Sequence, residues 1–139
     1  MIELEGSCHC GNLRVRLHST RAAGELPLRA CDCTFCRKHG ARTTADPEGH
    51  LEVKVAEAGE LSRYQFGLKT GEFLVCRRCG TYVAATMREG GSWLAVLNVN
   101  LLADQSPFAR PAESISYDGE TSEQRIARRK QRWMPCEMK

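Results

Sequence analysis

Eight cysteines among 139 residues constrain this chain more than any other feature. Seven of them fall into three tight groups, which are Cys8-His-Cys10, Cys31-Asp-Cys33-Thr-Phe-Cys36 and Cys76-Arg-Arg-Cys79. The eighth is Cys136, near the end of the chain. Thiolates separated by one or two residues converge readily on one metal ion, and zinc takes four such ligands in a tetrahedron. The spacing therefore favours zinc binding.

Two other interpretations of the cysteines explain less. Disulfide frameworks are typical of small secreted chains, whereas a chain of this length can bury roughly two-thirds of its unfolded surface. Residues 1–5 lack the basic start and apolar stretch of a signal peptide, so we expect a cytoplasmic protein. No apolar run approaches the roughly 18 residues of a membrane span. A redox pair of Cys33 and Cys36 leaves Cys31 unexplained, and no βαβ pattern surrounds it.

The seven grouped cysteines divide into a set of four and a set of three. The two outer pairs together make a closed site of four thiolates, which is usually structural. Its ligands are Cys8, Cys10, Cys76 and Cys79. The middle group leaves one position for water or substrate, which is the pattern of a catalytic zinc. Its ligands are Cys31, Cys33 and Cys36. We therefore predict two zinc ions per chain.

Two further residues could close the second site. His39 follows the middle group at C-x2-C-x2-H spacing, and Cys136 could fold back as a fourth ligand. Either would make both metals structural. The chain would then be a non-catalytic two-zinc structural or binding module, contacting protein or nucleic acid through its basic end.

Hydrophobic patterning over most of the chain indicates β-structure. Residues 13–17 and 51–55 alternate strictly between apolar and polar side chains. Short apolar or aromatic runs follow, separated by glycines, at residues 64–66, 72–75, 82–85 and 93–97. No segment before residue 120 carries an apolar stripe at helical spacing over three turns. We predict a single domain over residues 1–139, mainly antiparallel β, with short helical turns near Thr34–Lys38 and after Asn100.

The last twenty residues form a basic C-terminal tail. Residues 120–139 hold six basic and three acidic side chains, whereas the rest of the chain is balanced. Thr121 or Ser122 is suited to cap a short helix that ends at Gln131. Thiolate ligands and zinc would together bring the chain near neutrality, so we do not expect nucleic-acid binding. A solvated helix face explains the charges more simply.

The three cysteine motifs in combination resemble a known family, that of the glutathione-dependent formaldehyde-activating enzymes, also called the centromere-protein-V family. The resembling segments are Gly6–Gly11, Cys31–Ala41 and Cys76–Gly80, together with Trp133-Met-Pro near the end. The resemblance implies a β-tent fold built of antiparallel sheets. It also implies that the outer cysteine pairs hold a structural zinc and that the middle group holds the catalytic one.

The implied activity joins formaldehyde and glutathione into S-hydroxymethylglutathione, a carbon–sulfur lyase reaction in the reverse sense. A zinc ion with three thiolate ligands is a weak Lewis acid, but it still binds a further thiol as thiolate. We therefore expect a zinc-dependent carbon–sulfur lyase that acts on a small thiol, glutathione by default, or on its aldehyde adduct. Arg37 and Lys38 follow the last ligand and could partly offset the negative charge of a three-thiolate zinc centre or hold a substrate carboxylate. Exposed charges at a turn explain them equally well.

Overall fold

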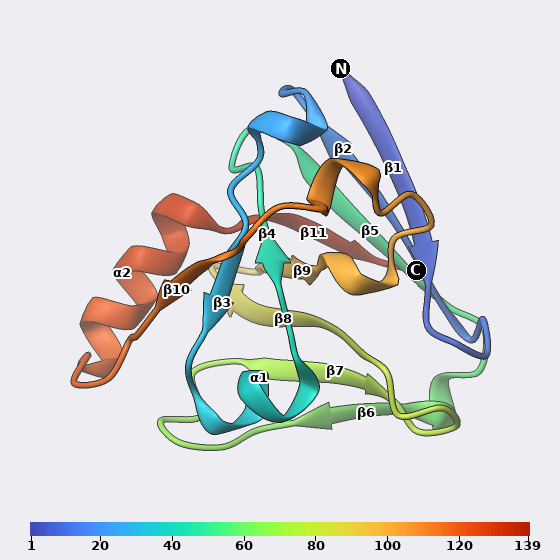
Figure 1. The fold of residues 1–139 in the computed structure, drawn as a ribbon. Coiled ribbons are helices and arrows are strands. Elements are labelled where there is room, and N and C mark those ends of the chain that lie inside the picture. Colours follow the sequence, from blue (N-terminus) through green and yellow to red (C-terminus); the bar gives the residue numbers. More distant parts are fainter.

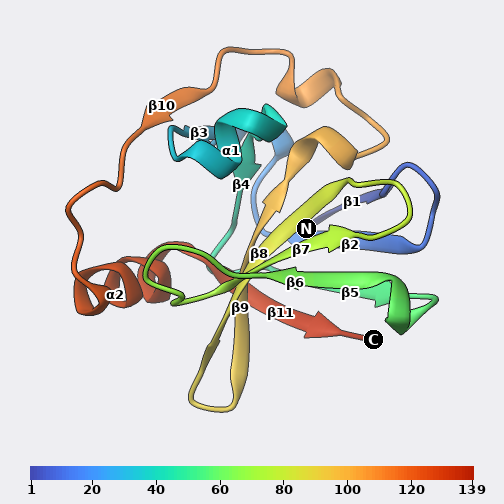
Figure 2. The same ribbon diagram turned by 90° about the horizontal axis from the view of Figure 1, so that it is seen from below.

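Eleven strands form one branched sheet in the computed structural model, which describes residues 1–139 (Figure 1). The longer arm runs β1 (Ile2–Ser7), β2 (Leu13–Ser19), β5 (His50–Val55), β11 (Met134–Met138), β9 (Ser92–Asn98), β4 (Thr43–Thr44), β3 (Arg29–Cys31) and β10 (Glu113–Ile115). The second arm leaves the sheet at β9 and runs through β8 (Tyr82–Glu89) and β7 (Glu72–Cys76) to β6 (Leu61–Tyr64) (Figure 2). The mainly β fold predicted from the sequence is confirmed.

Two α-helices and four single 3-10 turns complete the structure. The helix α1 (Thr34–His39) follows β3, and α2 (Ser122–Arg132) follows β10. The 3-10 turns are η1 (Ala23–Glu25), η2 (Ala58–Glu60), η3 (Val99–Leu101) and η4 (Ser106–Phe108). The predicted helical turns near Thr34–Lys38 and after Asn100 are therefore present. None of the helices has the length and apolar character that a membrane crossing requires.

Local sequence sets the ends of both α-helices. In α2 the Thr121 hydroxyl accepts from the Gln124 amide at 3.1 Å, and the Gln124 side chain accepts from the Thr121 amide at 2.9 Å. This reciprocal capping box satisfies two amides that the helix cannot pair internally. In α1 the Cys33 sulfur accepts from the Cys36 amide at 3.4 Å, so a cysteine begins the helix.

Apolar side chains gather in two clusters. The larger one takes the buried positions of the alternating strands, as in β2, where Leu13, Val15 and Leu17 are buried and the arginines between them are exposed. The smaller one lies where α1, β8 and the end of α2 meet. Its buried members are Cys36, Ala41, Tyr82, Ala85, Met87 and Trp133. The smaller cluster supports the candidate site.

Three details differ from the expectations. The run at residues 64–66 is not a strand of its own, because β6 ends at Tyr64 and the chain then turns through Gly67, which has a φ of 62°. Two strand pairs, β3 with β10 and β5 with β11, are parallel. The predicted helix over residues 122–131 extends by one residue, and the segment after it forms β11 inside the sheet, between β5 and β9.

Candidate metal centres and the adjoining cavity

The two outer cysteine pairs meet at one end of the sheet. Cys8 and Cys10 follow β1, whereas Cys76 ends β7 and Cys79 lies in the next turn. All four sulfur atoms lie within 4.8 Å of one another. The Cys10 sulfur lies 3.7 Å from that of Cys8 and 3.6 Å from that of Cys76. A tetrahedral zinc with Zn–S bonds of ~2.3 Å separates its sulfurs by about 3.8 Å, so this set fits the metal.

Two tight turns shape this four-cysteine cluster. Gly11 has a φ of 84° and its amide donates to the Cys8 carbonyl at 3.1 Å. Gly80 repeats the arrangement with a φ of 77° and a 2.8 Å bond to the Cys76 carbonyl. A positive φ favours glycine, which explains the residue after each cysteine pair. The Leu13 amide donates to the Cys8 sulfur at 3.3 Å.

The middle cysteines form the second cluster, at the junction of β3 and α1. Cys31 ends β3, Cys33 caps α1, and Cys36 lies in its first turn, with all three sulfurs within 4.8 Å of one another. Hydrogen bonds from Cys31 and Cys36 lower the pKa of Cys33, whereas the pKa of Cys36 is raised by its pairing with Cys31 and Cys33. Protons shared in this way are released when the thiols bind a metal. The donor set suits zinc with one position left over.

Neither alternative ligand joins this three-cysteine cluster. The His39 ring bonds instead to the Phe35 carbonyl through Nδ1 at 2.9 Å, and it packs on the Phe35 ring with centroids 4.3 Å apart. Cys136 is held in β11, where it pairs with Leu51 and Trp93. The potential metal ligands at this site are therefore the three cysteine sulfurs.

A cavity opens beside the three-cysteine cluster, with about 850 Å³ of empty space that includes open solvent at its mouth. Ten of the 18 lining residues are hydrophobic, and five of these are aromatic. The aromatic ones are Phe66, Phe73, Tyr82, Tyr117 and Trp133. A mostly apolar wall lowers the local dielectric and strengthens every polar contact inside.

Tyr82 is the most deeply buried polar residue on the cavity wall, with 2% of its surface exposed. Burial raises the pKa of Tyr82 well above its usual value, and negative charge on Cys36, Cys33 and Cys31 raises it further. The hydroxyl therefore keeps its proton at neutral pH. A protonated phenol is a hydrogen-bond donor. The edge of the Tyr82 ring packs against Phe35, with centroids 5.0 Å apart.

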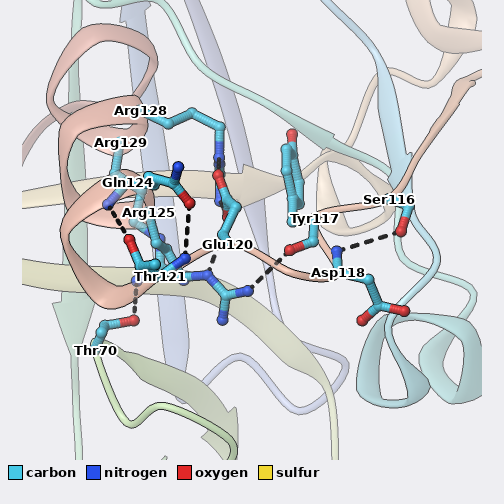
Figure 3. Close-up of polar contacts among 10 residues, drawn as sticks. All are labelled: Thr70, Ser116, Tyr117, Asp118, Glu120, Thr121, Gln124, Arg125, Arg128 and Arg129. Carbon is cyan, nitrogen blue, oxygen red and sulfur yellow. Dashed lines mark hydrogen bonds and ion pairs between the residues drawn. The ribbon is translucent and has the colours of Figure 1, made fainter.

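The cavity wall also carries positively charged side chains. Those that line the cavity are Arg29, Arg125, Arg128, Arg129 and Arg132. Glu120 binds two of them, with Arg125 Nε at 3.1 Å and Arg128 Nε at 2.8 Å (Figure 3). The Arg128 guanidinium also lies 3.5 Å from the centroid of the Tyr117 ring. One carboxylate is thus shared by two guanidinium groups. The wall therefore keeps a net positive charge.

Sequence reasoning identified the cysteines but not the rest of the wall. Arg37 and Lys38 are exposed on α1 and do not line the cavity, so the structure offers no support for their contact with substrate. The arginines of α2 were noticed only as a basic tail. Their spacing at 125, 128, 129 and 132 places them on one helix face, and this could have been predicted from the sequence. Nothing in the sequence brings that face to the cysteines.

Comparison with known proteins decides the family. The sequence model of the family described as "Glutathione-dependent formaldehyde-activating enzyme" (GFA) matches residues 3–118. The chain belongs to the GFA family. The match includes all seven grouped cysteines and ends before α2. The predicted resemblance is confirmed.

Two relatives agree with this assignment. A Halomonas elongata protein named as a candidate glutathione-dependent formaldehyde-activating enzyme is 32% identical over 119 residues, which cover 81% of this chain and 72% of the relative. A crystal structure of a Rhodobacter sphaeroides protein is 29% identical, with a TM-score of 0.59 over 80% of this chain and 99% of that chain. The Rhodobacter sphaeroides protein therefore shares the fold of this chain.

Proposed function

We propose that this GFA-family chain is a zinc-dependent carbon–sulfur lyase that forms or breaks the adduct between a thiol and an aldehyde, with glutathione and formaldehyde as the default pair. The four-cysteine cluster would hold a structural zinc and the three-cysteine cluster a catalytic one. The observation that carries the proposal is the second cluster. Three converging thiols, with no fourth protein ligand, lie on the wall of a small-molecule cavity.

Zinc at Cys31, Cys33 and Cys36 would supply a fourth position where a thiol binds and loses its proton at neutral pH. The chain's own residues provide the rest. In the synthetic direction the substrate sulfur bonds to the aldehyde carbon, the carbonyl electron pair moves onto the oxygen, and that oxygen takes the proton that the thiol released. The reverse reaction returns thiol and aldehyde, and no further reactant is consumed.

Tyr82 is placed to act on the aldehyde oxygen. Its hydroxyl is protonated at neutral pH, and the residue lines the same cavity as the three thiols. A donor aimed at an oxygen that gains negative charge stabilises the transition state more than the ground state. The aromatic wall, including Phe73 and Trp133, excludes water and strengthens this hydrogen bond.

The alternative, a non-catalytic two-zinc module, requires a fourth protein ligand at the second cluster. His39 and Cys136 were the residues able to supply it, and neither lies within ligand distance of the three sulfurs. The arginines of the basic tail line the cavity rather than a separate face, which further favours a small ligand over a macromolecule.

Exchange spectroscopy with ¹³C-formaldehyde and glutathione tests the proposal, because it measures the interconversion of free aldehyde and hydroxymethyl adduct directly. We expect the zinc-loaded protein to accelerate this exchange above the rate in buffer. Cys33→Ser should lose the acceleration, and Cys136→Ser, which removes a thiol outside both clusters, should retain it. A wild-type protein that holds two zinc ions and leaves the buffer rate unchanged would refute the proposed activity.

A further inference from the structure

Arg129 is an unusual residue on the cavity wall because it is both charged and buried. Only 7% of its surface is exposed. Burial lowers the pKa of Arg129 to about 10, with the positive charges of Arg128 and Arg125 contributing, so the side chain is still cationic at neutral pH. Burying an unpaired cation is costly, and native proteins usually pair such a group with an anion.

The structure gives Arg129 no anionic partner. Glu120, which lies just before α2, binds Arg125 and Arg128 instead (Figure 3). A guanidinium group has five N–H donors, yet the one hydrogen bond of Arg129 joins Nη1 to the Thr70 hydroxyl at 2.9 Å. Its Nε is buried and has no acceptor.

The surroundings hold the Arg129 guanidinium in one place. It stacks on Trp133, with Cζ 4.5 Å from the ring centroid. On another side it approaches Gly71, where a Cβ atom would lie 3.1 Å from Nη1 and 2.6 Å from the Thr86 carbonyl. A glycine is therefore needed at position 71 for the backbone and the guanidinium to fit together. A fixed, dry and unpaired guanidinium is preorganised to bind a planar anion such as a carboxylate.

We propose that Arg129 binds a carboxylate of the substrate, so that the enzyme selects thiols that carry an acidic group. The inference rests on the proposed function, which identifies the ligand as a thiol. The sulfur of that thiol would bind at the three-cysteine cluster, and its carboxylate would bind Arg129. It concerns a part of the chain that the family match does not reach, since that match ends at residue 118. The reaction that supplies the substrate would then yield a mercapto acid or an acidic peptide thiol.

The test compares three small probes on the zinc-loaded full chain, by calorimetry and by tryptophan fluorescence, which reports on Trp133. The probes are 3-mercaptopropionate, its neutral amide 3-mercaptopropionamide, and propionate, which has no thiol. We expect the acid to bind at least about tenfold more tightly than the amide, as a charge-assisted hydrogen bond predicts. In Arg129→Gln this preference should disappear while affinity for the amide is unchanged. Lys130→Gln is the matched control, because it removes a cation from the exposed face of the same helix and should keep the preference.

The three probes separate this inference from the proposed function. Propionate should bind weakly to the wild type and not to Arg129→Gln, even if no thiol reaches the metal. If the amide binds but the acid has no advantage in the wild type, Arg129 only offsets the charge of the thiolates and the inference is wrong, whereas the proposed function stands. Equal affinity of the wild type for acid and amide overturns the inference even if Arg129→Gln does not fold.

Discussion

Tyr82 has two roles, because it packs in the smaller core cluster and takes part in the proposed chemistry. The residue belongs to that cluster and also lines the cavity. Tyr82→Phe keeps the ring and removes the donor, so we expect kcat/KM to fall about 100-fold while thiol binding at the metal is unchanged. Formaldehyde exchange and thiol titration measure the two effects separately. Tyr64→Phe, at an exposed ring outside the cavity, should leave both unchanged, and equal activity of Tyr82→Phe would remove the hydroxyl from the mechanism.

Asp46 makes a second prediction at the scale of single residues. Burial alone would raise the pKa of Asp46, but donation from the Ser19 hydroxyl, the Thr20 amide and hydroxyl and the Glu48 amide lowers it to about 2. Because an unfolded aspartate titrates near ~3.9, the carboxylate stabilises the fold fully above about pH 4, and this contribution is lost between about pH 4 and pH 2.

Asp46→Asn should therefore lower the free energy of unfolding by about 1–3 kcal/mol at pH 7 and by much less near pH 2. The quantity to measure is the difference between variant and wild type in denaturant at each pH, because acid also protonates the cysteine ligands of both proteins. Asp118→Asn, at an exposed position, should change stability by less than about 0.5 kcal/mol. A pH-independent difference would show that the carboxylate charge has no part in stability.

Elements with strong local signals were predictable, and those fixed by long-range pairing were not. The alternation in residues 13–17 and 51–55 predicted β2 and β5 because one face of each strand is buried. Strands of two or three residues, such as β3, β4 and β10, are too short to show a period. The short spacing within each cysteine motif is local and was read from the sequence, and the structure brings the outer two motifs together as expected. Tyr82 and Arg129 come to the cysteines only through tertiary packing.

Strand β11 shows how context overrides a local rule. Pro135 argues against a central strand, because proline donates no hydrogen bond to a sheet. The strand tolerates it because residues 134–136 pair with β9 whereas pairing with β5 begins at Cys136, so Pro135 has a strand partner on one side only. The end of the chain is thus part of the sheet.

Loss of a side chain from β11 should affect the whole domain. Met134 has none of its surface exposed and belongs to the larger core cluster. We expect Met134→Ala to lower the free energy of unfolding by about 2–5 kcal/mol, the usual cost of such a cavity. Glu137→Ala, at an exposed position of the same strand, should cost less than about 0.5 kcal/mol. If chemical denaturation shows similarly small changes in the free energy of unfolding for both variants, β11 does not contribute to the stability of the fold.

At the scale of the whole molecule, the two cysteine clusters have different places in the fold. The four-cysteine cluster ties the turn after β1 to the end of β7, so it joins the two arms of the sheet. The three-cysteine cluster spans six residues at one edge of the cavity. Metal binding at the first cluster would therefore contribute directly to folding, whereas metal binding at the second would mainly add a reactive centre to a structure that is already folded.

Paired serine variants test this difference. Cys76→Ser should unfold or aggregate, because it opens the site that joins the arms. Cys36→Ser should stay folded and lose one of two zinc ions, and Cys136→Ser should keep both. Circular dichroism and elemental analysis of each purified protein give the two readouts. Equal loss of structure in Cys76→Ser and Cys36→Ser would mean that both clusters are structural.

The central claim is that the three-cysteine cluster holds a metal with a position open to a thiol. Cobalt in place of zinc tests it directly, because thiolate ligation changes the visible spectrum of cobalt. Titration with glutathione, and with a simpler thiol, should produce a saturating change from one of the two metals, with release of a proton. Cys33→Ser should abolish that change. If thiols leave both cobalt centres unchanged, the second metal is closed and the account of this chain as a thiol-activating enzyme is wrong.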